Sequence, residues 1–422
     1  MLIYTVKAGD TVQKISASYN VPPFVINALN EPPTDYLVPG QRLVLRRPSA
    51  LYTVKIGESI STIAEAAGIE ANTLLRNNPQ AINRVLYPGE TLVLGYEDDN
   101  EKGRSLLINA YTYPYTNKSL IVKALPYLSM LTIFTYGFTP SGELIAPDDE
   151  EVIALAASYG VKPVMLISTL TAEGTFSNEL ADFLLSSPYL QDILIERILE
   201  NMLSKGYYAL DIDFEYVPAR NKEAYIAFVE NITNRLNQNG LFTIVALAPK
   251  TSSTQPGLLY ESHDYFALGM AANLAFTMTY EWGYTYGPPM AVAPINKVRE
   301  VLEYAVTEIP PQKLLMGIPL YGYDWNIPFV RGTAATSLSP QQAIVIAYEN
   351  GVPISYDESA QAPFFRYGND THEVWFEDAQ SIYAKLGLLD SFSLSGAGYW
   401  NLARDFPQNW AVLNALFGIT RL

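Results

Sequence analysis

The 422-residue chain contains no cysteine and only two histidines, His263 and His372. The missing thiols exclude disulfide bonds, a cysteine nucleophile and cysteine-ligated zinc. A histidine-rich metal site is disfavoured as well, and we expect neither a metal nor an organic cofactor. A Ser-His-Asp site would have to use one of the two histidines, both of which we expect to be solvated. The chemistry that remains is mainly that of carboxylates and of 30 tyrosines.

Positive charge and long apolar runs are also scarce. The chain has 27 Lys and Arg against 43 Asp and Glu, a net charge of −16, which repels phosphate backbones and disfavours nucleic-acid binding. The apolar runs are only as long as strands, so we expect no membrane insertion. The first residues, MLIYTVKAGDT, lack the basic and apolar regions of a secretory signal. The length predicts about three domains.

The first hundred residues contain a duplication. Tyr4–Thr11 recurs as Tyr52–Ser59, and Asn30 recurs as Asn78. We therefore place two units at residues 1–46 and 50–95. Each unit is predicted to consist of a strand, two helices and a second strand. The alternating Tyr-Thr-Val indicates the first strand, and the side-chain oxygens in the following Gly-Asp-Thr or Gly-Glu-Ser can cap the first helix.

This repeat resembles the LysM module, which binds glycans that contain N-acetylglucosamine. The resemblance implies a sugar site between the first strand–helix loop and the second helix–strand loop. The implied residues are Gly9, Asp10, Thr11, Leu29 and Asn30 in the first unit, and Gly57, Glu58, Ser59, Asn77 and Asn78 in the second. The alternative is a structural repeat with no ligand, and Glu58-Ser59 departs from the family's Asp-Thr.

The charged, glycine-flanked stretch from Gly95 to Arg104 is predicted to be a linker. After it, apolar strands alternate with amphipathic helices, the clearest of which are 189–204, 221–238 and 296–307. The predicted strands are 105–111, 130–136, 162–168, 207–215, 241–248, 274–280, 314–320 and 395–400. Eight strands in this pattern predict an α/β protein whose residues 104–422 form a (β/α)₈ TIM barrel. An aromatic segment at about 326–376 is expected to be a small α+β insertion between strands seven and eight.

Three carboxylates alternate at the end of the predicted fourth strand. Side chains alternate along a strand, so Asp211, Asp213 and Glu215 share one face and are expected to point into the barrel. Neighbouring like charges would keep Glu215 protonated, so that it could protonate a leaving oxygen. The alternative is a solvated edge or a cation site. No second carboxylate at another strand end is evident as a nucleophile, which favours attack by an acetamido oxygen of the substrate itself.

The sequence Asp-Ile-Asp-Phe-Glu at residues 211–215 resembles the signature of family 18 glycoside hydrolases. Met278–Trp282, Gly317–Gly322 and Trp400 resemble that family's motifs on strands six, seven and eight. With two LysM units, the chain looks like the spore-cortex-lytic N-acetylglucosaminidases, the YaaH-type spore germination hydrolases. The departures are Tyr208-Ala209 in place of Asp-Gly, Ser168–Leu170 in place of Ser-x-Gly-Gly, and Glu281 in place of Asp.

The resemblance implies a role for each matched residue. Glu215 is the general acid and later the base, Asp213 orients the acetamido group, Asp211 supports the charge of Asp213, and Tyr280 hydrogen-bonds the acetamido carbonyl. Trp400 stacks beneath the sugar, although plain core packing is an alternative. Further expected substrate contacts are Trp282, Tyr321, Trp325, Tyr111 and Glu281; Tyr136 is an additional candidate.

The leading hypothesis is a retaining glycosidase that acts on peptidoglycan, in particular on the spore cortex during germination. The alternatives are a chitinase and, outside enzymes, a glycan-binding barrel. We expect a monomer whose partners are peptidoglycan or chitin-like glycans. We expect it in the spore cortex or coat, reached without a secretory signal, and otherwise in the cytoplasm.

Overall fold

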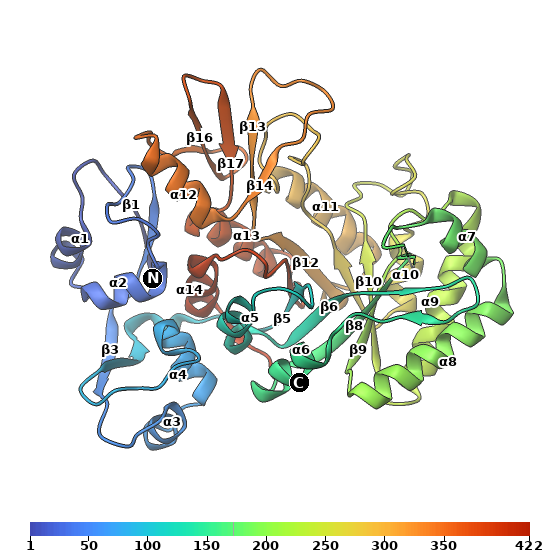
Figure 1. The fold of residues 1–422 in the computed structure, drawn as a ribbon, viewed down its shortest axis with the longest axis horizontal. Helices are drawn as coiled ribbons and strands as arrows, with labels where there is room; N and C mark the ends of the chain where they lie inside the picture. Colours follow the sequence, from blue (N-terminus) through green and yellow to red (C-terminus); the bar gives the residue numbers. More distant parts are fainter. Residues whose placement is uncertain (172) are drawn as a thin grey trace.

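The computed structural model describes residues 1–171 and 173–422 (Figure 1). Eight parallel strands close into a barrel in chain order, because the first strand pairs with both the second and the last. They are β5 (Ser105–Thr112), β6 (Met130–Phe138), β8 (Lys162–Ser168), β9 (Ala209–Asp213), β10 (Phe242–Leu247), β11 (Leu274–Thr277), β12 (Leu314–Pro319) and β18 (Gly396–Trp400). The predicted TIM barrel is confirmed.

Helices surround this barrel, and the predicted segments 189–204, 221–238 and 296–307 correspond to three of them. They are α5 (Lys118–Ala124), α6 (Glu150–Ser158), α7 (Asn178–Leu185), α8 (Pro188–Lys205), α9 (Lys222–Asn237), α10 (Tyr265–Ala271), α11 (Ile295–Glu308), α13 (Ala379–Ser391) and α14 (Pro407–Leu416). Two short strands lie at the margins: β7 (Leu144–Ile145) beside β6, and β19 (Gly418–Ile419) beside β5. Short 3₁₀ turns lie in the connections of the barrel: η3 (Leu125–Tyr127), η4 (Ala219–Asn221) and η5 (Pro311–Lys313); η1 (Pro79–Ala81) belongs to the second N-terminal unit.

The insertion between β12 and β18 is an antiparallel sheet with one helix, α12 (Pro340–Glu349). Its strands are β13 (Gly322–Asn326), β14 (Thr336–Leu338), β15 (Ser355–Asp357), β16 (Ala362–Tyr367) and β17 (His372–Trp375), in the sheet order β14-β13-β17-β16-β15. It begins slightly earlier than the sequence pattern predicts. In Figure 1 this sheet rises above the barrel on the side of β12 and α11.

The two N-terminal units have the predicted order of strand, helix, helix and strand. Their elements are β1 (Leu2–Thr5), α1 (Val12–Tyr19), α2 (Pro23–Asn30) and β2 (Arg42–Leu45), then β3 (Pro48–Thr53), α3 (Ile60–Ala67), α4 (Ala71–Asn77) and β4 (Thr91–Tyr96). Thr11 and Ser59 cap α1 and α3. Asp10 does not cap the helix; it accepts hydrogen bonds from the Tyr4 hydroxyl at 2.7 Å and the Lys7 amide at 2.8 Å. Glu58 repeats this arrangement with Tyr52 and Lys55.

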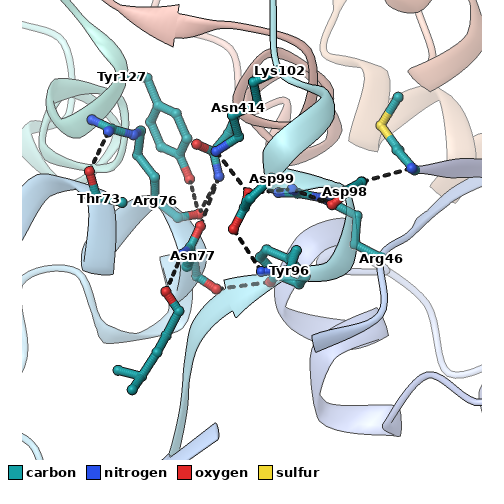
Figure 2. A network of polar contacts seen from close by, with 12 residues as sticks. Arg46, Thr73, Arg76, Asn77, Tyr96, Asp98, Asp99, Lys102, Tyr127 and Asn414 are labelled. Carbon is teal, nitrogen blue, oxygen red and sulfur yellow. Dashed lines mark hydrogen bonds and ion pairs between the residues drawn. The ribbon is translucent and has the colours of Figure 1, made fainter. Parts of the chain in front are cut away.

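The stretch after β4 connects the second unit to the barrel in a packed form. It contains the 3₁₀ helix η2 (Glu97–Glu101), where Asp98 lies 2.6 Å from the guanidinium of Arg46 (Figure 2). On the same network, Asn414 of α14 donates to Asn77 at 3.1 Å. The connection between the second unit and the barrel is therefore an ordered polar interface.

The first unit is joined to the insertion and to the barrel as well. Val38 belongs to the apolar core of the insertion, packed with Leu338 and Ile344. Arg42 lies 3.0 Å from Asp378 at the start of α13. Hydrophobic residues of the first unit and of the barrel form one continuous buried cluster. The predicted division into separate domains with a linker does not anticipate these interfaces.

In residues 1–171 and 173–422, no helix has both the length and the apolar character needed to cross a membrane.

Candidate active site

The barrel places two of the predicted carboxylates on β9 and the third just beyond it. Asp211 is fully buried, and Tyr111 of β5 donates its hydroxyl to Asp211 Oδ2 at 2.7 Å. Asp213 ends the strand, and Glu215 follows two residues later, at the carboxyl end of the barrel. The alternate residues Leu210 and Ile212 are completely buried, as is expected of positions that pack under the helices. The same strand thus supplies both core packing and the acidic centre.

Burial raises the pKa values of all three carboxyls, and nearby carboxylates add to the rise for Asp213 and Glu215. Burial raises the pKa of Asp211 to about 7, against the lowering effect of the hydrogen bond from Tyr111. The pKa of Asp213 is well above its usual value because of burial and the nearby charges of Glu215 and Asp211. Burial and then the charge of Glu281 raise the pKa of Glu215. Such a cluster retains protons near neutral pH, which a general acid needs.

The loop after β11 brings Tyr280 and Glu281 to these carboxylates. The Tyr280 ring packs against Gly317 of β12, where a Cβ atom would lie 2.8 Å from Tyr280 Cε1. Burial and the charges of Asp213 and Glu215 raise the pKa of Tyr280, so its hydroxyl remains a hydrogen-bond donor. Glycine at position 317 therefore leaves room for the tyrosine.

Glu281 has a left-handed backbone with φ 68°. Its Oε1 accepts hydrogen bonds from the hydroxyls of Tyr321 and Tyr323, the latter at 3.0 Å. Desolvation raises the pKa of Glu281 against the effect of both donors. Although Glu281 follows strand six, its acceptor oxygen is directed at the tyrosines that begin the insertion.

Trp400, at the end of β18, is half-buried in a group of aromatic rings. Its ring centroid lies 5.1 Å from Phe134, 5.5 Å from Tyr111 and 6.0 Å from Tyr113. Because Tyr111 also holds Asp211, Trp400 lies close to the carboxylates. A flat apolar face in this position suits stacking against a sugar ring.

A groove of about 640 Å³ continues from this aromatic group across the ends of β5, β6 and β8. Its lining residues are Tyr113, Pro114, Tyr115, Phe134, Thr135, Pro147, Asp148, Leu170, Gly174 and Phe176. Its aromatic residues were not predicted from the sequence. The Tyr111-Thr-Tyr-Pro-Tyr115 run at the end of the first strand is the signal that could have indicated them.

The structure corrects one expected substrate contact and places the others. Trp325 is 1% exposed and donates its indole N–H to the Gly287 carbonyl at 2.9 Å, so it is a core residue of the insertion and the prediction is wrong. Tyr111 and Tyr321 are also buried and reach the site through the carboxylates that they hold. Trp282 is half-buried beside the barrel core. Tyr136 is fully buried and binds Asp149, away from the acidic centre.

His263 is buried, contrary to the expected solvated position. Its Nδ1 accepts the Ala248 amide at 2.9 Å, and its Nε2 lies 3.2 Å from the Phe214 carbonyl. Burial lowers the pKa of His263 to about 4, so the ring is neutral and joins the ends of β9 and β10. His372 is partly exposed and lies 3.0 Å from Asp324.

The structure also divides the residues that the LysM resemblance implies. Asn30 is completely buried, and its side-chain amide makes three hydrogen bonds with the backbone. Its Nδ2 donates to the carbonyls of Ile26 and Val44, and its Oδ1 accepts from the Val44 amide. Asn78 makes the equivalent bonds in the second unit. Because their amides are occupied by the fold, the prediction that these two asparagines contact glycan is wrong. Leu29 is a core residue as well.

Other predicted LysM residues lie on accessible loops or at the domain interface. Asp10 and Thr11 line a groove of about 700 Å³ in the first unit, together with Val12, Gln13, Asn27, Glu31, Pro32, Thr34, Asp35, Tyr36 and Leu37. Gly9 and Gly57 have positive φ angles in the turns before α1 and α3, where Glu58 and Ser59 follow Gly57. Asn77 is buried, with its side chain between Leu94 and Asn414. Its predicted glycan contact is therefore wrong.

Within the described parts of the chain, no group of three or more acidic, histidine or cysteine side chains is arranged to hold a metal ion. The chemistry that this arrangement can perform is proton transfer by carboxyls, with tyrosines as hydrogen-bond donors and an aromatic floor.

Comparison with known proteins agrees with both parts of the molecule. The family model for glycosyl hydrolases family 18 matches residues 96–405, and the LysM domain model matches residues 4–46 and 52–95. A protein named cortical fragment-lytic enzyme from Bacillus subtilis (strain 168) is 43% identical over 328 residues, which cover 75% of this chain and 76% of that protein.

Two further relatives span the whole chain. The cortical fragment-lytic enzyme of Bacillus cereus is 36% identical and is covered, like this chain, over 99% of its length. The crystal structure of the spore cortex-lytic enzyme SleL from Bacillus megaterium QM B1551 has a TM-score of 0.84 and 38% identity, covering 100% of this chain and 99% of that one. The similarity thus extends over the LysM domains, the barrel and the insertion together.

Proposed function

The chain belongs to family 18 of the glycosyl hydrolases and carries two LysM domains, and from this membership we propose that it cleaves the β-1,4 bonds of N-acetylglucosamine in spore cortex peptidoglycan during germination. The observation that carries the choice of substrate is the full-length similarity to cortical fragment-lytic enzymes. A glycan-binding barrel without activity is disfavoured, because Asp211, Asp213 and Glu215 are all retained at the carboxyl end of the barrel.

In the proposed mechanism Glu215 donates a proton to the leaving oxygen, a role that the rise of its pKa by burial and by the charge of Glu281 favours. The acetamido oxygen of the substrate attacks the anomeric carbon and forms an oxazolinium ring. Asp213 faces that positive ring and orients the acetamido N–H, while Tyr280 donates to the acetamido carbonyl. Glu215 then acts as the base that activates water, and the product keeps the β configuration.

Asp211 and Trp400 have supporting parts in this scheme. Asp211, held by Tyr111, accepts or releases a proton as the charge of Asp213 changes, because the two carboxyls lie on the same face of β9 and repel each other. Trp400 supports the sugar at the cleavage point by stacking.

The groove of the first LysM domain is proposed to be a second glycan-binding site, outside the barrel. Asp10 and Thr11 contribute polar groups, and Tyr36, which is 69% exposed, contributes a flat apolar face. Attachment to peptidoglycan and association with the spore follow from this proposal and from the similarity to spore cortex-lytic enzymes.

Mass spectrometry of digests would test this function. Cortex fragments should yield products with N-acetylglucosamine at the new reducing end, and cortex should be cleaved with a higher kcat/KM than chitohexaose. Faster cleavage of chitohexaose would favour a chitinase instead, and muramic acid at the new reducing end would refute the proposed bond specificity.

A further inference from the structure

The groove of the first LysM domain borders the insertion. Tyr36, which lines the groove, lies beside Tyr348 in the last turn of α12, with ring centroids 6.5 Å apart and planes 15° from parallel. Carbon atoms in contact lie about 3.5–4.0 Å apart, so these rings do not cover each other's faces. Tyr36 is 69% exposed and Tyr348 is 38% exposed. Two domains therefore supply one accessible aromatic surface, and Figure 1 shows α12 beside the first unit.

The barrel and the insertion also hold the loop that forms the groove. Glu31 lines the groove and has a left-handed backbone with φ 38°. Gln341 of α12 donates its side-chain amide to the Glu31 carbonyl at 3.0 Å, and Lys123 of α5 lies 2.6 Å from the Glu31 carboxylate. A side-chain-bearing residue adopts this backbone conformation only where its surroundings compensate for the strain. The shape of the groove thus depends on contacts outside the LysM domain.

The turn that follows Tyr36 is docked on the insertion. The Ile354 amide donates to the Pro39 carbonyl at 2.9 Å. At Gly40, where φ is 86°, a Cβ atom would lie 1.9 Å from the Ile354 carbonyl oxygen, so only glycine permits this approach. Because Ile354 shortly follows α12 in the chain, the contact between the two backbones fixes Tyr36 relative to Tyr348.

The second LysM domain presents the same turn without such a contact. Its residues 87–89 are the copy of residues 38–40. A Cβ atom at Gly89 would have no neighbour within 4 Å among the residues that the structure describes, and Tyr87 is exposed. Counted back from this turn, Val85 occupies the place that Tyr36 has in the first domain. The aromatic surface is therefore specific to the first domain, although both domains share one fold.

Charge and shape limit what this surface can bind. Asp10, Glu31 and Asp35 line the groove, so it repels anionic groups and also a second copy of this chain, whose net charge is −16. Carboxylates accept hydrogen bonds from hydroxyl and acetamido N–H groups. Aromatic faces pack against the C–H faces of sugar rings. The surface therefore matches an uncharged chain of sugars.

We infer that Tyr348 binds glycan together with Tyr36, so that the insertion completes the glycan site of the first LysM domain. The inference rests on the proposed function of the groove and adds to it a residue from outside the LysM domain. Gln341 and Lys123 are positioning residues, because they act through Glu31. Attachment to the glycan thus depends on the docking of the LysM domain against the insertion and the barrel.

The competing explanation is that Tyr348 only stabilises the docked domain. Two substitutions separate a sugar-binding ring from a packing contact: Tyr348→Phe keeps the ring, and Tyr348→Leu keeps an apolar side chain without a flat face. Tyr383→Leu is the matched control, since Tyr383 is 44% exposed on α13. Each variant is made in a Glu215→Gln background, which removes the proton donor. Thermal unfolding of each variant reports on packing.

Calorimetry with chitohexaose should resolve binding at the barrel and at the groove, and the groove event is the one that Tyr36→Ala weakens. Tyr348→Leu should raise the Kd of that event by about threefold to tenfold, the range expected for one aromatic contact. The barrel event should not change. Tyr348→Phe and Tyr383→Leu should stay within about twofold of the parent at both sites. An unchanged groove event in Tyr348→Leu would overturn the inference.

A second measurement detects contact with the ligand directly, without any change at the groove. Tetranitromethane nitrates accessible tyrosines, and peptide mass spectrometry locates the modified residues. In the Glu215→Gln protein, chitohexaose should protect both Tyr36 and Tyr348 from nitration and should leave Tyr383 unprotected. Protection of Tyr36 alone would mean that Tyr348 acts only through packing, and it would overturn the inference even if Tyr348→Leu weakened binding.

These outcomes distinguish the inference from the proposed function. A weaker groove event in Tyr36→Ala with no effect of Tyr348→Leu would confine the site to the LysM domain, refuting the shared site and retaining the proposed groove. No effect of either substitution on attachment to sacculi would refute both. A parent protein that does not cleave cortex fragments but shows protection of both tyrosines would refute the hydrolase and retain the shared site.

Discussion

The hydroxyl of Tyr111 on the first barrel strand donates a hydrogen bond of 2.7 Å to Oδ2 of Asp211 on the fourth strand, and both side chains are buried. The bond lowers the pKa of Asp211, but burial outweighs it and the pKa remains about 7. The carboxyl farthest from solvent in the acidic centre is therefore also one that titrates near neutrality.

Asp211→Asn should change the pH dependence of stability. The folded-state pKa of about 7 lies above the ordinary value of 3.8, so the native state binds this proton more tightly than the unfolded chain does. The stabilisation is fully present below about pH 4 and is lost as the pH rises through about 7. Relative to the parent, the variant should gain a few kcal/mol of unfolding free energy between these pH values, at about 1.4 kcal/mol per pKa unit. Urea unfolding from pH 4 to 8 measures this difference, with Asp390→Asn at an exposed site as the control. If the unfolding free energy of Asp211→Asn changed with pH in parallel with that of the parent, the prediction would be contradicted.

Glu215→Gln should lose turnover and retain glycan binding. The amide keeps the size of the side chain but has no acidic proton, so the rate should fall by at least about a hundredfold. Steady-state kinetics and calorimetry with chitotetraose give the two readouts. Glu303→Gln, on the exposed face of α11, should match the parent. A near-normal rate in Glu215→Gln would remove Glu215 from the role of general acid.

Glu281→Gln should shift the alkaline limb of the pH–rate profile. The charge of Glu281 raises the pKa of Glu215, so removing it lowers that pKa. Because the acid must be protonated, activity should then be lost at a lower pH than in the parent. The pH profile of kcat/KM measures this, with Glu358→Gln on the exposed part of the insertion as the control. A limb that stays in place or moves upward would be inconsistent with electrostatic coupling between the two carboxyls.

Asp213→Asn and Tyr280→Phe should slow the chemical step to different extents. Asp213→Asn removes a negative charge that faces the oxazolinium, so its loss should be the larger. Tyr280→Phe removes one hydrogen bond, which corresponds to about 1–3 kcal/mol for a buried partner left unpaired.

A thiazoline analogue of N-acetylglucosamine should also inhibit, because it mimics the intermediate ring. Proton NMR of a fresh digest reports the anomeric configuration, and an initial α signal would exclude the participation of the acetamido group.

Tyr36→Ala should weaken binding to insoluble sacculi without changing the hydrolysis of short soluble substrates. The side chain is 69% exposed and lines the groove of the first LysM domain. Tyr189→Ala is a matched control, because Tyr189 is 77% exposed on α8. A pull-down on sacculi measures attachment. Deletion of residues 1–95 is a poorer test, because it would expose the buried faces of α13 and α14. If Tyr36→Ala bound sacculi as well as the parent does, this groove would not be the attachment site.

The barrel could be predicted from the sequence because each strand is a short apolar run followed by an amphipathic helix. The alternation of Asp211, Ile212 and Asp213 along β9 likewise indicated which side chains face inward. Such periodic signals arise from burial, and burial is regular within strands and helices.

Features that depend on contacts between elements, or that lie on loops, could not be predicted in this way. Trp325 follows a barrel strand, yet the antiparallel sheet of the insertion encloses it, and only the folded sheet reveals this. Asn30 is part of a repeated motif for a structural reason, because its amide closes backbone hydrogen bonds. Tyr115 lies on a loop, where a single residue shows no periodicity. His263 owes its burial to two strand ends that are distant in sequence.

The docking of the first LysM domain has a consequence for where the glycan is cut. Two contacts hold the LysM groove at a constant position relative to Glu215. They are the ion pair between Arg42 and Asp378 and the packing of Val38 in the core of the insertion. A flexibly tethered module lets the catalytic domain sample a volume around its anchor, with a local concentration set by the tether. A docked module instead fixes the distance between the bound part of the glycan and the bond that is cut. A glycan strand that occupies both sites should therefore yield fragments of a defined length, which depends on the distance between the two sites in the protein.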